Sequence, residues 1–204
     1  MLVSHFKMIL GTIIVSFFGG IIYFLILKIR RQSFEKDRFW YRWLFTTYLL
    51  SLFSLTLLPL PGPNDFLTTQ EPHYILRPFA FLQRIRLQLS AHPLSTYRSL
   101  LMGLLTEDVI MQPILNILLM LPLGYYLAYF KQKPIRKIIL ITVLLSLTIE
   151  LLQLTGLLFL YQQPYRLFEI DDLMLNTIGG ICGSWLGQSL RKNAIFLNNK
   201  RDQS

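Results

Sequence analysis

Two runs of acidic and amide side chains lie in or beside segments that are apolar enough to cross a membrane. Glu150 and Gln153 belong to the first run, and Asp171, Asp172 and Asn176 belong to the second. A carboxylate at the centre of a bilayer costs roughly 2.5–3.5 kcal/mol, so it is found there with a polar partner or a wet cavity and marks a candidate functional site. Glu150 and Asp172 are therefore candidates for a catalytic acid and base, or for a polar binding site.

Helical spacing predicts that these side chains meet. Glu150 and Gln153 are three residues apart and Asp172 and Asn176 are four apart, so each pair shares one helix face. Asn116 lies about one turn into the preceding apolar segment. We expect these five side chains to gather near one end of three helices, with Arg166 on the adjoining loop as a candidate counter-ion.

The sequence leaves a structural interpretation open for each of these residues. Glu150 and Gln153 could fix the helices through hydrogen bonds, although a second amide would do so at lower cost than a carboxylate. Asp171 and Asp172 could cap the N-terminus of their own helix, where free backbone N–H groups and the helix dipole favour negative charge. Asn176 could bond to a neighbouring helix.

The composition indicates an integral membrane protein. Of the 204 residues, 53% are hydrophobic and 15% are charged, against about 25% charged in soluble domains. The charges lie between apolar stretches that reach the ~20 residues needed to cross a bilayer. The net charge of +9 is typical of basic loops beside membrane spans, so we expect no nucleic acid partner. The single cysteine, Cys182, excludes an internal disulfide.

The predicted fold is all-α, a polytopic transmembrane helical bundle with five spans. Residues 1–60 hold two N-terminal spans with a basic cytoplasmic loop, 61–112 form an extracellular loop, 113–190 form a three-helix core, and 191–204 form a cytoplasmic tail. The polar residues Asn193–Ser204 of this tail are expected to lack regular structure. The fourth span should break near Gly156, because glycine is a poor helix interior residue. The expected spans are Met8–Leu27, Trp40–Leu60, Pro113–Phe130, one from Ile138, and Leu173–Leu190.

The extracellular loop shows two amphipathic patterns, Pro78–Leu89 and Leu94–Leu105. Each predicts a helix that lies on the membrane surface or packs over the bundle. Arg84, Arg86 and Arg98 are most simply a solvated face, although they could also meet anionic headgroups or polyprenyl-phosphate carriers.

The positions of the basic residues predict the orientation. The segments 28–42, 131–137 and 191–204 hold 14 of the 20 Lys and Arg residues, and cytoplasmic loops carry this excess. The N-terminus is then outside and the C-terminus is cytoplasmic, in a multi-pass protein of the plasma membrane with membrane lipids as partners.

Glycines at intervals of four predict close helix packing. Gly179, Gly183 and Gly187 form a stripe of small residues that lets another helix approach. Gly124 and Gly180 are further packing candidates. His5, His73 and His92 show no metal-ligand spacing, so we expect neither a metal nor another cofactor. Oligomeric state is not predicted.

Three runs, taken together and in this order, resemble the VanZ-like family of bacterial membrane proteins. They are Asn116–Gly124, Leu145–Gln153 and Ile170–Gly183. The resemblance covers roughly residues 75 to 190, and Arg77-Pro78-Phe79 is similar to a short motif on the preceding outer segment of that family. The resemblance implies a role in the cell envelope, since the founding member is associated with resistance to the glycopeptide antibiotic teicoplanin.

Three hypotheses of function follow. The polar residues could bind a lipid-linked cell-wall precursor or a lipoglycopeptide at the outer leaflet and so shield the antibiotic's target. They could instead form an intramembrane enzyme in which Glu150 and Asp172 act as an acid and base pair. A small transporter is the third hypothesis, against which stands the lack of a detectable inverted repeat. Whether the protein is an enzyme stays open at this point.

Overall fold

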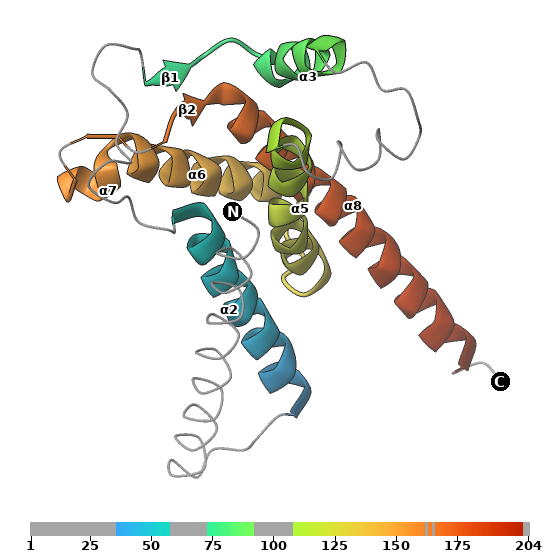
Figure 1. Cartoon of the computed structure of the whole chain (residues 1–204). Helices are drawn as coiled ribbons and strands as arrows, with labels where there is room; N and C mark the ends of the chain where they lie inside the picture. Colours follow the sequence, from blue (N-terminus) through green and yellow to red (C-terminus); the bar gives the residue numbers. More distant parts are fainter. Residues whose placement is uncertain (1–35, 58–72, 92–107, 162, 165, 202–204) are drawn as a thin grey trace. The chain divides into compact units, whose positions relative to one another are not determined.

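A computed structural model describes residues 36–57, 73–91, 108–161, 163–164 and 166–201 (Figure 1). The chain divides into two compact units, Met1–Asn64 and Asp65–Ser204, which are described separately. The predicted span Met8–Leu27 and the predicted surface helix Leu94–Leu105 lie outside the described residues.

The first unit contributes one described helix, α2 (Lys36–Leu57), close to the predicted Trp40–Leu60. The hydroxyls of Thr46, Thr47 and Thr56 each donate to the carbonyl oxygen four residues earlier, at 2.9 Å. These bonds satisfy the polar side chains within the helix itself.

The second unit is built on three long helices, α5 (Asp108–Tyr129), α6 (Ile135–Leu154) and α8 (Ile170–Arg201). Two of the described helices have segments long and apolar enough to cross a membrane, Ile110–Tyr129 in α5 and Ile135–Leu154 in α6. The described residues are mostly helical, as predicted, whereas the number of five spans stays a prediction.

Helix α8 corrects the expectation of an unstructured tail. It passes the predicted end of the span at Leu190 and continues to Arg201. The added segment contains no proline or glycine, the residues that most often end a helix, so the helix extends beyond the apolar stretch.

Helices α5 and α8 run parallel, and α6 runs antiparallel to both. Gly179 faces the backbone of Ile117 and Gly183 faces that of Leu121, so the residue numbers rise together along α5 and α8. The numbers run in opposite directions between α6 and α8, where Thr142 meets Gly180 and Ser146 meets Asn176. The buried apolar side chains between the helices include Met120, Leu123, Ile138, Ile149 and Leu175.

The fourth predicted helix breaks near Gly156, as expected. After α6 ends at Leu154, the short element α7 (Gly156–Phe159) has positive φ angles from 56° to 66° at all four of its residues. Glycine adopts this left-handed conformation without steric cost, and a Cβ at Gly156 would meet the carbonyl oxygen of Tyr161. The chain therefore leaves α6 through a sharp turn.

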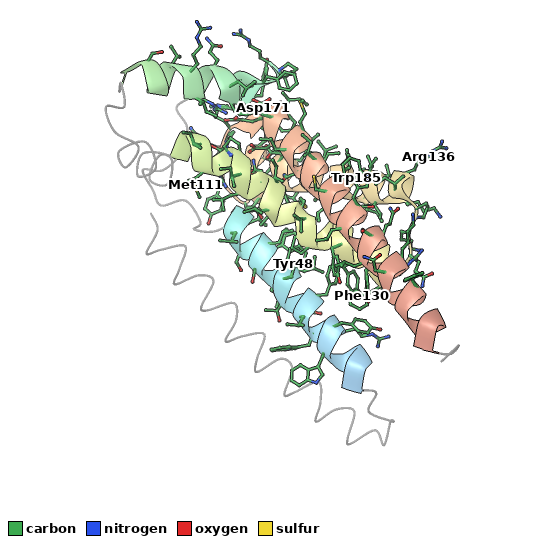
Figure 2. All side chains as sticks on the ribbon, turned by 90° about the vertical axis from the view of Figure 1, so that its right-hand side faces the viewer. Tyr48, Met111, Phe130, Arg136, Asp171 and Trp185 are labelled. Atoms are coloured by element: carbon green, nitrogen blue, oxygen red, sulfur yellow. The ribbon has the colours of Figure 1, made fainter. Side chains whose placement is uncertain are left out.

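A short parallel strand pair was not predicted. Strand β1 (Tyr74–Ile75) pairs with β2 (Phe168–Glu169), and the Phe168 N–H donates to the His73 carbonyl at 3.0 Å. Helix α3 (Ala80–Ala91) follows β1 and begins two residues after the expected Pro78. The pair attaches the segment that carries α3 to the chain directly before α8, at the end of α8 where Figure 2 labels Asp171.

Candidate functional site

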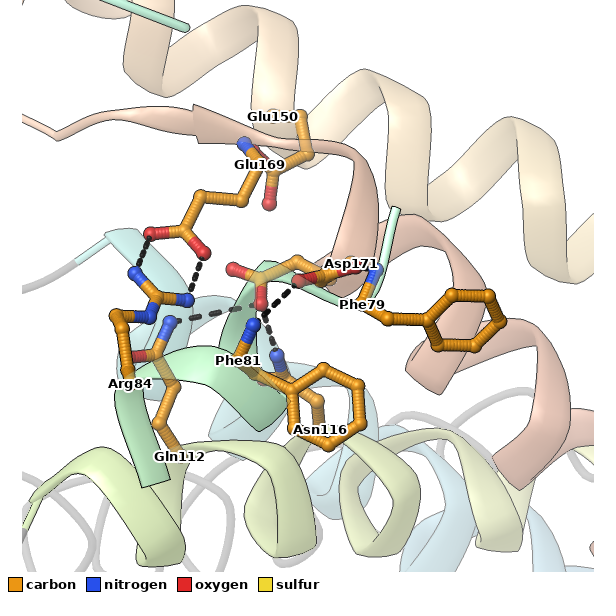
Figure 3. Close-up of polar contacts among 9 residues, drawn as sticks. Phe79, Phe81, Arg84, Gln112, Asn116, Glu150, Glu169 and Asp171 are labelled. Carbon is orange, nitrogen blue, oxygen red and sulfur yellow. Dashed lines mark hydrogen bonds and ion pairs between the residues drawn. The ribbon is translucent and has the colours of Figure 1, made fainter. Parts of the chain in front are cut away.

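Polar side chains from α3, α5, α6 and the β2–α8 junction gather at the N-terminal end of α8 (Figure 3). We call this group the polar cluster. Its members are Arg84, Gln112, Asn116, Glu150, Glu169, Asp171 and Asp172.

Asp171 holds the N-terminus of α3. Its Oδ1 accepts the N–H of Phe79 at 2.6 Å, and its Oδ2 accepts the N–H of Phe81 at 2.9 Å. The side chain is 2% exposed. A carboxylate at this position satisfies N–H groups that have no partner within their own helix. The predicted capping role is therefore directed at a different helix, more than 80 residues away in the sequence.

Phe79 needs this support because its backbone is in the left-handed region, with φ of 62°. A residue with a bulky side chain adopts this conformation only when its surroundings stabilise it. The bond from Phe79 to Asp171 holds the turn between Arg77-Pro78 and α3.

Asp172 contacts α5 instead. Its Oδ1 accepts from Nδ2 of Asn116 at 2.5 Å and from Nε2 of Gln112 at 3.4 Å. Gln112 and Asn116 are four residues apart and share one face of α5. The structure thus brings Asn116 and Asp172 together, as the spacing suggested, and adds Gln112, which sequence reasoning missed.

Glu169 and Arg84 form an ion pair that sequence reasoning also missed. Nη1 of Arg84 donates to Oε1 of Glu169 at 2.8 Å, and Nη2 donates to Oε2. The hydrogen bond to Glu169 raises the pKa of the Arg84 guanidinium above its ordinary value, and burial opposes this effect. Arg84 was assigned to a solvated face, and the pairing with the buried Glu169 corrects that assignment. The signal that could have identified Glu169 is its position, since it is a third acidic residue only two positions before Asp171.

Glu150 reaches the same cluster from α6. Its Oε2 accepts the backbone N–H of Glu169 at 3.2 Å, and its side chain is 3% exposed. Burial and the neighbouring Asp172 disfavour a negative charge on Glu150, while Arg166 favours a charge on both carboxyl groups. Gln153, on the same face of α6, is 4% exposed.

Asn176 lies one turn further along α8 and contacts α6. Its Nδ2 donates to Oγ of Ser146 at 2.8 Å, whereas its Oδ1 is buried and has no partner among the described residues. The amides of Asn116 and Asn176 therefore serve different helix pairs.

The glycines line the contacts that hold these helices in place. An added Cβ at Gly179, Gly183 or Gly187 would meet backbone atoms of α5, and one at Gly124 would meet the backbone of Gly180. Gly180 itself faces Thr142 of α6. Close approach of this kind is what small residues allow between membrane helices. The approach fixes the distance between Asn116 and Asp172.

The polar cluster contains more carboxyl groups than cationic side chains. Four carboxylates gather there with the guanidinium of Arg84, and the exposed Arg166 acts on two of them. No group of three or more His, Cys, Asp or Glu side chains in the described part of the chain is arranged to hold a metal ion. The cluster is suited to accepting hydrogen bonds from N–H groups or moving a proton between carboxylates.

Comparison with known proteins gives a family assignment. The model of the VanZ/LLP1 family matches residues 45–191, which include every member of the polar cluster. No curated protein and no solved structure matches the chain. The matched region spans most of the 204 residues; the chain belongs to the VanZ/LLP1 family of membrane proteins.

Proposed function

We propose that the protein binds a ligand through the polar cluster at the outer face of the plasma membrane and thereby contributes to tolerance of teicoplanin. The observation that carries this proposal is the presence of Glu150 and Asp172 at one end of the helices, beside Asp171 and Glu169, which the start of α3 and Arg84 already compensate. Carboxylates there cost free energy unless partners or a ligand compensate them, and a purely structural contact could use neutral amides.

The chemistry of the cluster favours a ligand with amine or amide N–H groups. Ionised carboxylates only accept hydrogen bonds, and charge-assisted bonds of this kind are stronger than neutral ones. The peptide portion of a lipoglycopeptide, or of a lipid-linked cell-wall precursor, carries such groups beside a lipid chain. A ligand with both parts would place its lipid among the apolar helices and its peptide at the cluster.

The orientation in this proposal rests on the basic residues. The connection from α5 to α6 and the first turn of α6 hold Lys131, Lys133, Arg136 and Lys137, and this end lies opposite the polar cluster. With that end in the cytoplasm, the polar cluster faces the cell wall.

An enzyme is the second candidate, and one observation favours it. Burial and Asp172 disfavour a charge on Glu150, whereas Asp172 itself accepts hydrogen bonds from two amides. Two carboxylates in unlike environments can serve as acid and base. Mass spectrometry of a lipid-linked precursor incubated with the purified protein distinguishes turnover from binding.

Substitution Glu150→Gln tests the proposed function. The amide keeps the shape and the bond from the Glu169 N–H but removes the ionisable group. We expect a teicoplanin-sensitive bacterial host that expresses the variant to lose the added tolerance at an unchanged protein level. Thr148→Val, on the exposed face of α6, is the control and should retain it. Full tolerance with Glu150→Gln would reject a functional carboxylate at this position.

A further inference from the structure

A second polar site lies at the opposite ends of α5 and α8. A cavity of about 250 Å³ opens there between the two helices and the start of α6. Its lining includes Lys133, Arg191 and Lys192 but no acidic residue, together with Gln188, Pro134 and Ile135. Three cations around one cavity repel one another unless an anion neutralises them. We call this site the basic pocket.

The three cations have no carboxylate partner in the parts of the chain that the structure describes. In addition, Nε of Arg191 is buried and makes no hydrogen bond within those parts. A buried donor without a partner is unfavourable in a native protein, so it points to a partner that is not part of the described chain. A donor needs an acceptor as its partner, and the three positive charges around the cavity favour an anion.

The helix geometry supports an anion at the same place. Gln188, Arg191 and Lys192 share one face of α8 because they are spaced three and four residues apart. Pro134 precedes α6 and offers no side-chain cap, and the first turn of α6 contains no acidic residue. The first N–H groups of α6 therefore remain available, and a helix N-terminus favours an anion.

The turn that presents Lys133 is well defined. Gln132 adopts a positive φ of 51°, and the N–H of Lys133 donates to the Leu127 carbonyl at 2.9 Å. This closes the end of α5 and places Lys133 directly before the first turn of α6. The pocket is thus formed by backbone that the fold holds in place.

We propose that the basic pocket binds the phosphate group of an anionic membrane phospholipid. The pocket lies where two helices able to cross a membrane end and begin, at Tyr129 and Ile135. This is the depth of the lipid headgroups on either side of a bilayer. Basic pockets between membrane helices bind phosphate headgroups, and a headgroup at this depth can leave its acyl chains in lipid.

The test uses the purified full-length protein in detergent and native mass spectrometry with added lipid. Phosphatidylglycerol should bind at one saturable site, and Arg191→Gln should weaken this binding about tenfold. Arg136→Gln is the matched control, because it removes the same charge from an exposed residue of the first turn of α6 that does not line the pocket. This variant should bind phosphatidylglycerol with an affinity within about twofold of the unchanged protein, because water and salt screen the charge of an exposed residue.

Other arms of the experiment decide the source of the phosphate. Phosphatidylcholine should bind more weakly, since its quaternary ammonium meets three cations. If inorganic phosphate stabilises the protein but phosphatidylglycerol does not bind, the assignment to a lipid would be overturned. Equal weakening by Arg191→Gln and Arg136→Gln would also overturn the proposal, because it would show general attraction to charge. If Arg191→Gln does not fold, Lys192→Gln removes a neighbouring pocket charge and serves the same comparison.

Discussion

At the scale of single residues, two adjacent carboxylates do different work. Asp171 accepts two backbone N–H groups from the start of α3, and Asp172 accepts two side-chain amides from α5. Successive residues at the start of a helix point about 100° apart, so one acidic pair can reach two neighbours. Asp171 is therefore a positioning residue for α3, while Asp172 is a candidate for contact with a ligand.

This difference predicts unequal effects on stability. Asp171→Ala leaves two N–H groups of α3 without their acceptors and should lower the free energy of unfolding by about 1–3 kcal/mol. Asp172→Asn keeps an oxygen that accepts from Asn116 and should change it by less than about 1 kcal/mol. Unfolding of the purified proteins in detergent measures both. Equal losses would show that Asp171 does not have a separate capping role.

The pairing of Arg84 with Glu169 predicts a contrast along α3. Arg84→Ala leaves the carboxylate of Glu169, a residue only 5% exposed, without its cation. The Arg84 side chain is itself 36% exposed, so water screens the pair and the expected loss is about 1–2 kcal/mol. Arg86→Ala, two residues away and exposed, is the matched control and should cost less than about 0.5 kcal/mol. A double-mutant cycle with Glu169→Ala should return a favourable coupling energy between Arg84 and Glu169.

At the scale of helices and strands, close packing of α5 against α8 sets the geometry of the site. The glycine positions admit the α5 backbone so closely that a Cβ would collide with it. Asn116 and Asp172 face each other across this contact. A shift of α5 away from α8 would therefore break the hydrogen bond between them.

A larger side chain in this contact should disturb both the fold and the site. Gly183→Ala places a Cβ against the Leu121 carbonyl and should destabilise the protein by about 1–3 kcal/mol, as overpacking does elsewhere. Ser189→Ala introduces the same residue on an exposed part of α8 and should have little effect. Thermal unfolding of both variants measures the difference in stability. If Gly183→Ala leaves the stability unchanged, the two helices must lie further apart than the structure shows.

The sequence predicted the elements better than their contacts. The ~20-residue apolar runs of α5 and α6 and the break at Gly156 follow from length and glycine, which are local signals. The pairing of Asn116 with Asp172 followed from their similar depth in two apolar segments, because polar groups at that depth avoid lipid. The strand pair β1–β2 was missed because each strand has two residues, too few for a periodic pattern.

The ion pair of Arg84 with Glu169 joins positions 85 residues apart, and local spacing holds no information about such a contact. The cap of Asp171 on α3 was missed for the same reason. The helical tail after Leu190 was missed because a polar composition is typical both of an exposed helix and of a chain without regular structure.

At the scale of the whole molecule, polar groups separate to the two ends of the helices in unit Asp65–Ser204. Carboxylates dominate at the N-terminal end of α8, and cations dominate where α5 ends and α6 begins. This asymmetry has the sign expected of a protein whose basic end faces the cytoplasm. We therefore propose a different partner for each end of the helices, a ligand with N–H donors at the polar cluster and a phosphate group at the basic pocket.

The central claim is that the polar cluster binds a ligand, and equilibrium binding of teicoplanin to the purified protein in phosphatidylcholine nanodiscs tests it directly. We predict saturable binding that Glu150→Gln and Asp172→Asn each weaken about tenfold, as the loss of a charge-assisted hydrogen bond would, and that Arg86→Gln leaves unchanged. Binding by both carboxylate variants as tight as that of the unchanged protein would contradict the claim, and so would the absence of saturable binding.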